Sequence, residues 1–275
     1  MDSLEQLKDF DALFLACVEI GNIQEGMSFA GQEVLYNAEG LGKKILDHIM
    51  TARYLLKPMQ QAQFERKVDF SSMAVLTRSA FETYLIFYYL FIAPVNEDEK
   101  EFRLQSWRLG GLDRVKYKPA FNHTLDKWEK EISMAEEIRE KIKATTTFQQ
   151  LTDEDQKIVL KGKLLTRGWH KLAVDAGFTE QFFRQQYMYL SSYAHSNRLS
   201  VIQIQQVKTL DEQLEMGVSF IGILTVVLAK FMYDYVQAMP VLKAKIDLDS
   251  EKYALVMEYK LIGEMLGDFE ITEEK

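Results

Sequence analysis

The densest group of side chains able to do chemistry lies in residues 187–198, which read Tyr-Met-Tyr-Leu-Ser-Ser-Tyr-Ala-His-Ser-Asn-Arg. Tyr187, Ser191 and His195 are spaced four and four, so they share one face if a helix reaches His195. An imidazole there can act as a general acid or base. The alternative is a structural histidine, whose cation is favoured near the C-terminus of a helix. The serines, asparagine and arginine around His195 favour a functional site over a structural histidine.

A second candidate lies about one hundred residues earlier, where Arg78 and Glu82 stand four apart in a strongly apolar segment. Burying charges is costly unless they are paired. The two residues therefore form either an internal ion pair that fixes helix packing or a polar site on a buried helix. Their spacing alone leaves both interpretations open.

Basic side chains also gather between residues 102 and 118, where Asp113 is the single acidic residue and Trp107 and Tyr117 lie among them. Basic residues with aromatics can hold phosphates or stack nucleic-acid bases. Five charges over this length are sparse, so we favour a solvated helix face. The basic residues are Arg103, Arg108, Arg114, Lys116 and Lys118.

Several functional classes lack their sequence signatures in this chain. Neither the Gly-rich nucleotide loops nor the His-Glu-x-x-His and Glu-x-x-His metal patterns occur. Cys17 is the only cysteine, which excludes an intrachain disulfide and a cysteine-based metal site. We therefore predict no cofactor and no metal ion. The formal net charge of −8 argues against nucleic acid and anionic membranes as partners.

Two apolar stretches, residues 83–95 and 217–233, fall short of the roughly 20 apolar residues that a spanning helix needs. We predict buried central helices rather than membrane spans. Residues 1–5 lack the basic and apolar regions of a signal peptide. Together with the single cysteine, this predicts a cytoplasmic location.

Only 14 glycines and 4 prolines interrupt 275 residues, which favours long helices. Apolar residues recur at steps of three and four along most of the chain. We predict an all-α fold, an irregular multi-helix bundle of roughly nine helices with no significant sheet. We predict one domain over residues 1–275. An alternative is that residues 1–60 form a peripheral helical hairpin attached to it. Residues 199–204 alternate loosely and are predicted to be extended.

Two of these helices position the candidate residues. One begins near Asp69 or Ser71, ends before Pro94 and carries Arg78 and Glu82. The other is capped by Thr179 and carries the cluster of residues 187–195.

The chain resembles an uncharacterised bacterial all-helical domain-of-unknown-function family over about residues 70–200. The segment Arg78-Ser-Ala-Phe-Glu82 is similar to that family's Arg-x-x-x-Glu helix. A second block follows its order of Trp, Leu-Ala, Gly, Tyr, Ser and His, from Trp169 through Gly177 to His195. The resemblance implies an all-helical fold and supplies no established activity.

More distantly, the chain is similar to HEPN-like helical domains, in which an Arg four to six residues before a His serves RNA cleavage by paired subunits. Here those positions hold Ser191, Leu190 and Tyr189, and the nearest upstream arginine is Arg184. An RNA-acting role would therefore require Arg78 or Arg198 to lie beside His195 in the folded protein, where the arginine of that motif lies.

Our leading hypothesis is a polar pocket around Arg78, Glu82 and His195 that binds a small anionic or phosphate-bearing ligand. Arg78 would hold the anion, Glu82 would orient Arg78 or His195, and His195 would move a proton. The Arg78 and His195 side chains should then lie within about 8 Å of each other. The residues expected to line the pocket are Trp169, Ser191, Tyr193, Asn197 and Arg198.

Two other hypotheses remain: a non-enzymatic helical interaction module, and an RNA-acting protein. The sequence leaves open whether the chain is an enzyme and whether it forms a homo-oligomer.

Overall fold

The computed structural model describes residues 3–24, 33–60, 66–112, 125–246 and 250–266. The chain divides into two compact units, which are described separately. Unit 1 comprises residues 1–88 and 173–275, and unit 2 comprises residues 89–172. No local pattern in the sequence predicts this division.

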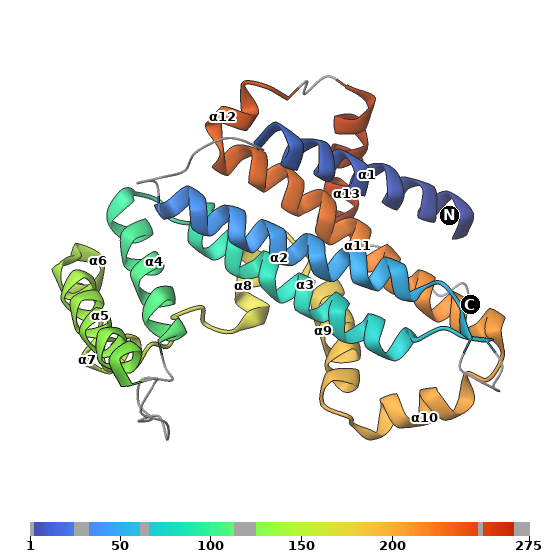
Figure 1. The fold of residues 1–275 in the computed structure, drawn as a ribbon, viewed down its shortest axis with the longest axis horizontal. Coiled ribbons are helices and arrows are strands. Elements are labelled where there is room, and N and C mark those ends of the chain that lie inside the picture. Colours follow the sequence, from blue (N-terminus) through green and yellow to red (C-terminus); the bar gives the residue numbers. More distant parts are fainter. Residues whose placement is uncertain (1–2, 25–32, 61–65, 113–124, 247–249, 267–275) are drawn as a thin grey trace, which may run out of the picture. The chain divides into compact units, whose positions relative to one another are not determined.

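Unit 1 contains most of the helices (Figure 1). Its elements are α1 (Ser3–Gln24), α2 (Glu33–Leu55), β1 (Met59–Gln60), β2 (Arg66–Lys67), most of α3 (Phe70–Phe91), the end of α8 (Trp169–Asp175), α9 (Glu180–Ala194), α10 (Arg198–Gln206), α11 (Leu210–Ala238), α12 (Pro240–Lys243) and α13 (Glu251–Met265). The strands β1 and β2 form a two-residue antiparallel ladder that pairs Met59 with Lys67 and Gln60 with Arg66.

The long helix α11 is the centre of unit 1. Helices α1, α2 and α13 pack against it, and α3 contacts it through aromatic rings. The Phe87 ring lies 5.3 Å from that of Phe231 and 5.7 Å from that of Tyr235, between centroids. Among the described residues, α11 alone is long and apolar enough to cross a membrane, and 72% of its most apolar window is buried. Its apolar surface thus forms the core of this unit.

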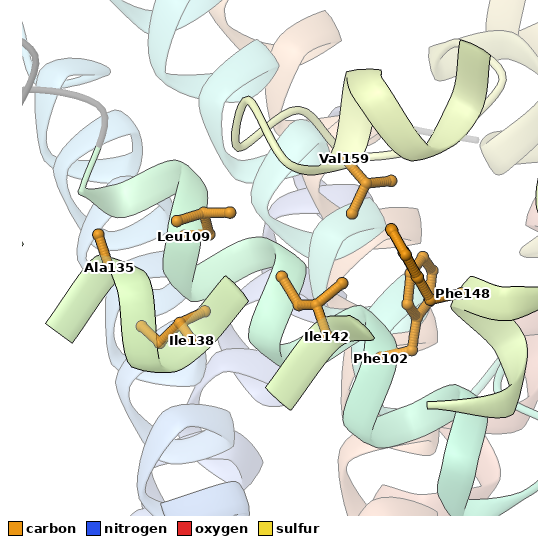
Figure 2. Close-up of a cluster of buried hydrophobic side chains, with 7 residues drawn as sticks. All are labelled: Phe102, Leu109, Ala135, Ile138, Ile142, Phe148 and Val159. Carbon is orange, nitrogen blue, oxygen red and sulfur yellow. The ribbon is translucent and has the colours of Figure 1, made fainter. Parts of the chain in front are cut away.

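Unit 2 has its own small core. It contains α4 (Glu97–Gly111), α5 (Leu125–Ala144), α6 (Thr146–Gln149) and α7 (Asp153–Val159), with the start of α8. Figure 2 shows the side chains that these elements bring together. They are Phe102, Leu109, Ala135, Ile138, Ile142, Phe148 and Val159.

Polar residues that the sequence marks as helix starts do cap helices. The side chains of Asn96, Thr152, Thr179 and Ser250 each accept a hydrogen bond from a backbone N–H in the first turn. Thr209 and Glu212 form a full capping box at the start of α11. Local hydrogen bonding therefore fixes where α9, which ends one residue before His195, begins.

The all-α class is confirmed, but the expected nine helices were too few, since thirteen occur in the described ranges. The short helices α6 and α12 were missed. The extended conformation predicted for residues 199–204 is wrong, because α10 covers them. The Asn197 side chain accepts from the N–H of Leu199, and this cap outweighs the weak helix propensity of the β-branched residues that follow.

Helices α1 and α2 contribute to the core of unit 1. Phe10 of α1 and Ile45 of α2 have no exposed surface. Arg53 of α2 donates to both carboxylate oxygens of Asp11 of α1, at 2.9 and 2.8 Å. The predicted start of the second helix near residue 28, and the predicted frayed end at residues 272–275, lie outside the described residues.

A buried polar network joins α3, α11 and α13. The Tyr84 hydroxyl donates to Asp234 Oδ2 at 2.8 Å, and Lys230 Nζ donates to Glu264 Oε1 at 3.1 Å. Burial raises the pKa of Asp234 from 3.8 to about 6, against the opposing effects of the Tyr84 hydrogen bond and the Lys230 charge. Burial likewise lowers the pKa of Lys230, although Glu264 opposes this shift.

Asp234 should make the stability of the protein fall as pH rises. Its raised pKa means that the folded protein holds the proton more tightly than the unfolded chain. The resulting stabilisation is present below about pH 4 and is lost as pH rises through about 6. From pH 4 to 7 the free energy of unfolding of wild type should therefore fall, relative to Asp234→Asn, by up to about 3 kcal/mol. Urea unfolding of both proteins across this range measures the difference.

Asp47→Asn provides the control, because Asp47 is an exposed residue of α2. The Asp234→Asn difference should depend on pH more strongly than the Asp47→Asn difference. Equal pH dependence of the two would mean that Asp234 does not have the raised pKa.

Candidate functional site

Aromatic packing places α3 beside α9. The Phe81 ring lies 4.7 Å from that of Phe178 and 5.6 Å from that of Phe183. Phe183 in turn stacks on Tyr187, with ring centroids 4.9 Å apart and an interplanar angle of 21°. Arg78 is one turn before Phe81 on α3. The apolar contacts thus bring the polar face of α9 to Arg78.

Arg78 is the hub of a four-residue cluster, which we call the Arg78 cluster and which contains Arg78, Glu82, Tyr187 and His195. Its Nε donates to Glu82 Oε1 at 2.9 Å, and its Nη2 lies 2.9 Å from the same oxygen. Nη2 also donates to the Tyr187 hydroxyl at 3.1 Å, and Nη1 lies 2.9 Å from His195 Nε2. The Arg78 side chain is 15% exposed and that of Glu82 is 25% exposed.

Tyr187 links the two charges. Its hydroxyl donates to Glu82 Oε1 at 2.8 Å while accepting from Arg78. Its ring centroid lies 5.1 Å from Arg78 Cζ, within the range of a cation–π contact. The guanidinium is therefore held both by its donors and over an aromatic face.

The contact between Arg78 and His195 is compatible with only one role for Nε2. A guanidinium has five N–H donors and no acceptor. Nε2 must therefore accept the hydrogen bond from Arg78, which leaves the imidazole neutral with its proton on Nδ1. His195 lies just past the end of α9, where its backbone N–H donates to Ser191 O at 3.0 Å. It is exposed, so the cluster opens to solvent at the imidazole.

Two members of the cluster have shifted pKa values. Burial alone would lower the pKa of Arg78, but the hydrogen bond to Tyr187 and the charge of Glu82 outweigh it and raise the pKa. Burial raises the pKa of Tyr187, and its hydrogen bond to Glu82 raises it further against the opposing effect of Arg78. Arg78 thus stays a cation and Tyr187 a neutral phenol.

Ser191 lies between Tyr187 and His195 on the same face of α9, one turn from each. Its hydroxyl oxygen is buried and finds no hydrogen-bond partner in the described part of the chain. A buried hydroxyl without a partner is costly. Ser191 Oγ is therefore an unused polar atom beside the cluster.

The structure brings together the three predicted catalytic residues, Arg78, Glu82 and His195, and the first and last of these lie well within the expected 8 Å. Tyr187 is an additional member. The sequence placed it on the face of Ser191 and His195, but we did not include it in the site. Its four-residue spacing from Ser191 was the signal that could have identified it.

The other predicted lining residues have different roles. The hydroxyl of Tyr193 donates to Gln203 at 2.9 Å, and Asn197 caps α10. Arg198 is exposed at the first position of α10. Trp169 belongs to unit 2 and is not counted in a site built within unit 1.

The predicted pocket and the predicted basic stretch of residues 102–118 are found only in part. Two cavities in unit 1 lie against α1 and α11, and Arg78 lines neither of them. In the basic stretch, Arg103 pairs with Glu99 at 2.5 Å and its Cζ lies 4.4 Å from the Tyr89 ring centroid. Arg114, Lys116 and Lys118 lie outside the described residues. The described ranges contain no group of three or more potential metal ligands.

Comparison of the chain with protein-family models, with curated proteins and with solved structures found no match. The family resemblance therefore stays a prediction, and a functional proposal must rest on the geometry of the Arg78 cluster.

Tyr187→Phe should destabilise the protein by about 1 kcal/mol, because it removes the hydroxyl that bridges Arg78 and Glu82 while keeping the ring. Chemical denaturation measures this change. Tyr36→Phe is the matched control, since Tyr36 of α2 is 67% exposed, and its effect should stay below about 0.5 kcal/mol. Equal effects of the two variants would mean that the bridge does not contribute to stability.

Proposed function

We propose that the Arg78 cluster binds a small anionic ligand that carries a phosphate group. The observation behind the proposal is the contact of Arg78 Nη1 with the exposed His195 at 2.9 Å. It places a permanent cation beside an imidazole where solvent can reach them. These are side chains that recognise phosphate oxygens as hydrogen-bond donors.

The hydrogen-bond inventory supports this proposal. The contacts of Arg78 use its Nε hydrogen, up to two Nη2 hydrogens and one Nη1 hydrogen. A second Nη1 hydrogen is left for a ligand, since each terminal nitrogen carries two. His195 Nδ1–H and the Ser191 hydroxyl are further candidate donors. Glu82 and Tyr187 hold the guanidinium in one orientation, which lowers the entropy cost of binding.

Arg78→Lys should weaken phosphate binding by about 10- to 100-fold, because an ammonium cannot reproduce the guanidinium fork and loses about 1.5–3 kcal/mol of charged hydrogen bonding. Isothermal titration calorimetry with inorganic phosphate or pyrophosphate measures the affinity. Arg184→Lys is the control, because Arg184 also pairs with a glutamate four residues away, at 2.7 Å, but is 63% exposed.

Arg184→Lys should bind like wild type. Wild type that binds neither ligand would refute the proposal. It would also favour the non-enzymatic interaction module, in which Arg78→Ala and His195→Ala mainly lower the melting temperature. Removing a binding residue, in contrast, often costs little stability.

A second candidate function is action on RNA, favoured by one observation. No arginine precedes His195 at the spacing of the HEPN-like motif, yet Arg78 reaches the imidazole from a different helix. Wild type should then cleave single-stranded RNA, and Arg78→Ala and His195→Ala should each abolish the cleavage. A wild-type preparation without activity on RNA, and without salt-dependent RNA binding, removes this candidate.

We also propose that the protein is cytoplasmic and that it comes from a bacterium. The single cysteine, Cys17, is buried in α1, and sparse cysteine use fits a reducing compartment. The bacterial assignment rests on the family resemblance alone.

A further inference from the structure

We propose that the Arg78 cluster takes up one proton together with its anion, and that His195 Nε2 is the proton acceptor. In this exchange Arg78 Nη1 turns from Nε2 to the anion. The inference rests on the proposed function and adds how the site is regulated, so that lower pH strengthens binding.

The first step follows from the donor inventory. In the ligand-free cluster, Nη1 donates to the Nε2 lone pair at 2.9 Å. Protonation converts that lone pair into a second N–H donor, and two donors cannot form a hydrogen bond with each other. The imidazolium and the guanidinium would also be like charges in contact. The neutral imidazole is therefore the form compatible with the observed contact.

The second step is that an anion makes the protonated form favourable. An oxyanion seated between the two groups accepts from Arg78 Nη1–H and from His195 Nε2–H at once. The proton comes from solvent, adds to the Nε2 lone pair and breaks no other covalent bond. The formal charge of the cluster changes from zero, with Arg78 balanced by Glu82, to +1, which the ligand then offsets.

No charge that the structure describes around His195 can offset the positive charge of the protonated cluster, so the ligand has to do so. Among the described residues, Arg78 of α3 contacts His195, Glu82 and Tyr187 contact Arg78, and Arg198 follows three residues later at the start of α10. Glu82 Oε1 is already shared by Arg78 and Tyr187. In the described part of the chain no carboxylate contacts His195, so an imidazolium there lacks a negative partner until an anion binds.

The backbone permits the side chain to move. His195 is the first residue past α9 and is exposed, and Ser196 after it has a φ of 51°, in the left-handed region. The chain therefore turns at His195 and Ser196, between the end of α9 and the start of α10. Rotation of the imidazole towards a ligand leaves the packing of Phe183 and Tyr187 intact.

Calorimetry with sulfate tests the proton uptake. Sulfate resembles phosphate but does not titrate near neutral pH, so every proton taken up belongs to the protein. Titrations at several pH values from 6.5 to 8, each in two buffers with different ionisation enthalpies, should give an uptake that rises with pH towards one proton per sulfate bound. Over the upper part of this range, affinity should fall by up to about tenfold per pH unit, as expected for one coupled proton.

His195→Gln is the diagnostic variant, because the glutamine amide oxygen can still accept from Arg78 Nη1 but cannot take up a proton. It should bind sulfate with no proton uptake and with affinity independent of pH. His48→Gln on α2 is the matched control and should behave like wild type. Thermal melts of both variants verify that they fold.

Several outcomes decide the inference. Sulfate and phosphate binding without proton uptake overturns it but leaves the proposed function standing, whereas binding of neither anion by wild type overturns both. Uptake retained in His195→Gln assigns the proton to another group and also overturns it. As a readout without ligand, imidazole ¹⁵N chemical shifts at pH 8 should identify the Nδ1–H tautomer. The Nε2–H tautomer would contradict the starting point.

Discussion

The constraint on which this site depends is the permanent charge of Arg78 on a helix that is otherwise built for a core. A guanidinium with 15% of its side chain exposed must be paired and hydrogen-bonded. Glu82 supplies the counter-charge from one turn along α3, Tyr187 supplies an acceptor from α9, and His195 supplies another from just past the end of α9. Satisfying one cation therefore fixes the orientation of α9 against α3, the tautomer of the imidazole and the direction of the phenol. The aromatic contacts of Phe81 and Phe183 bring the helices together, and the polar contacts select how they face each other.

The same rule operates at the second polar network of unit 1, with a different consequence. Lys230 is 3% exposed and is paired with Glu264 from α13, while its Nζ lies 5.1 Å from the Phe178 ring centroid. In that network Lys230 and Asp234 are buried and Glu264 is 32% exposed, and its charges serve the packing of α11 against α13 and α3. The Arg78 cluster instead ends in an exposed imidazole and keeps an unused guanidinium hydrogen. The exposed imidazole and the unused guanidinium hydrogen are why we assign ligand binding to one network and a structural role to the other.

Local signals in the sequence were sufficient for most helix starts and for the spacing of Arg78 from Glu82, because caps and four-residue steps depend on neighbouring residues. The contact of Arg78 with His195 joins residues 117 positions apart, and nothing in either segment specifies it. It depends on the packing of Phe81 against α9, which becomes visible only in three dimensions. Helix α10 was misjudged for a related reason: its β-branched residues suggest a strand, and the cap at Asn197 and the burial of Ser200 decide otherwise. The division into two units likewise follows from contacts that no local pattern encodes.

The arrangement also limits what chemistry His195 can perform. While Arg78 donates to Nε2, that nitrogen has no free lone pair and no proton, so it can act neither as a base nor as an acid. Nδ1–H can donate to a ligand, but it cannot abstract a proton. Acid–base catalysis therefore requires Arg78 to leave Nε2 first, and an anion that competes for the guanidinium provides the means. Binding thus precedes any reaction at this site: the ligand must first separate the arginine from the histidine before the imidazole can exchange a proton with it.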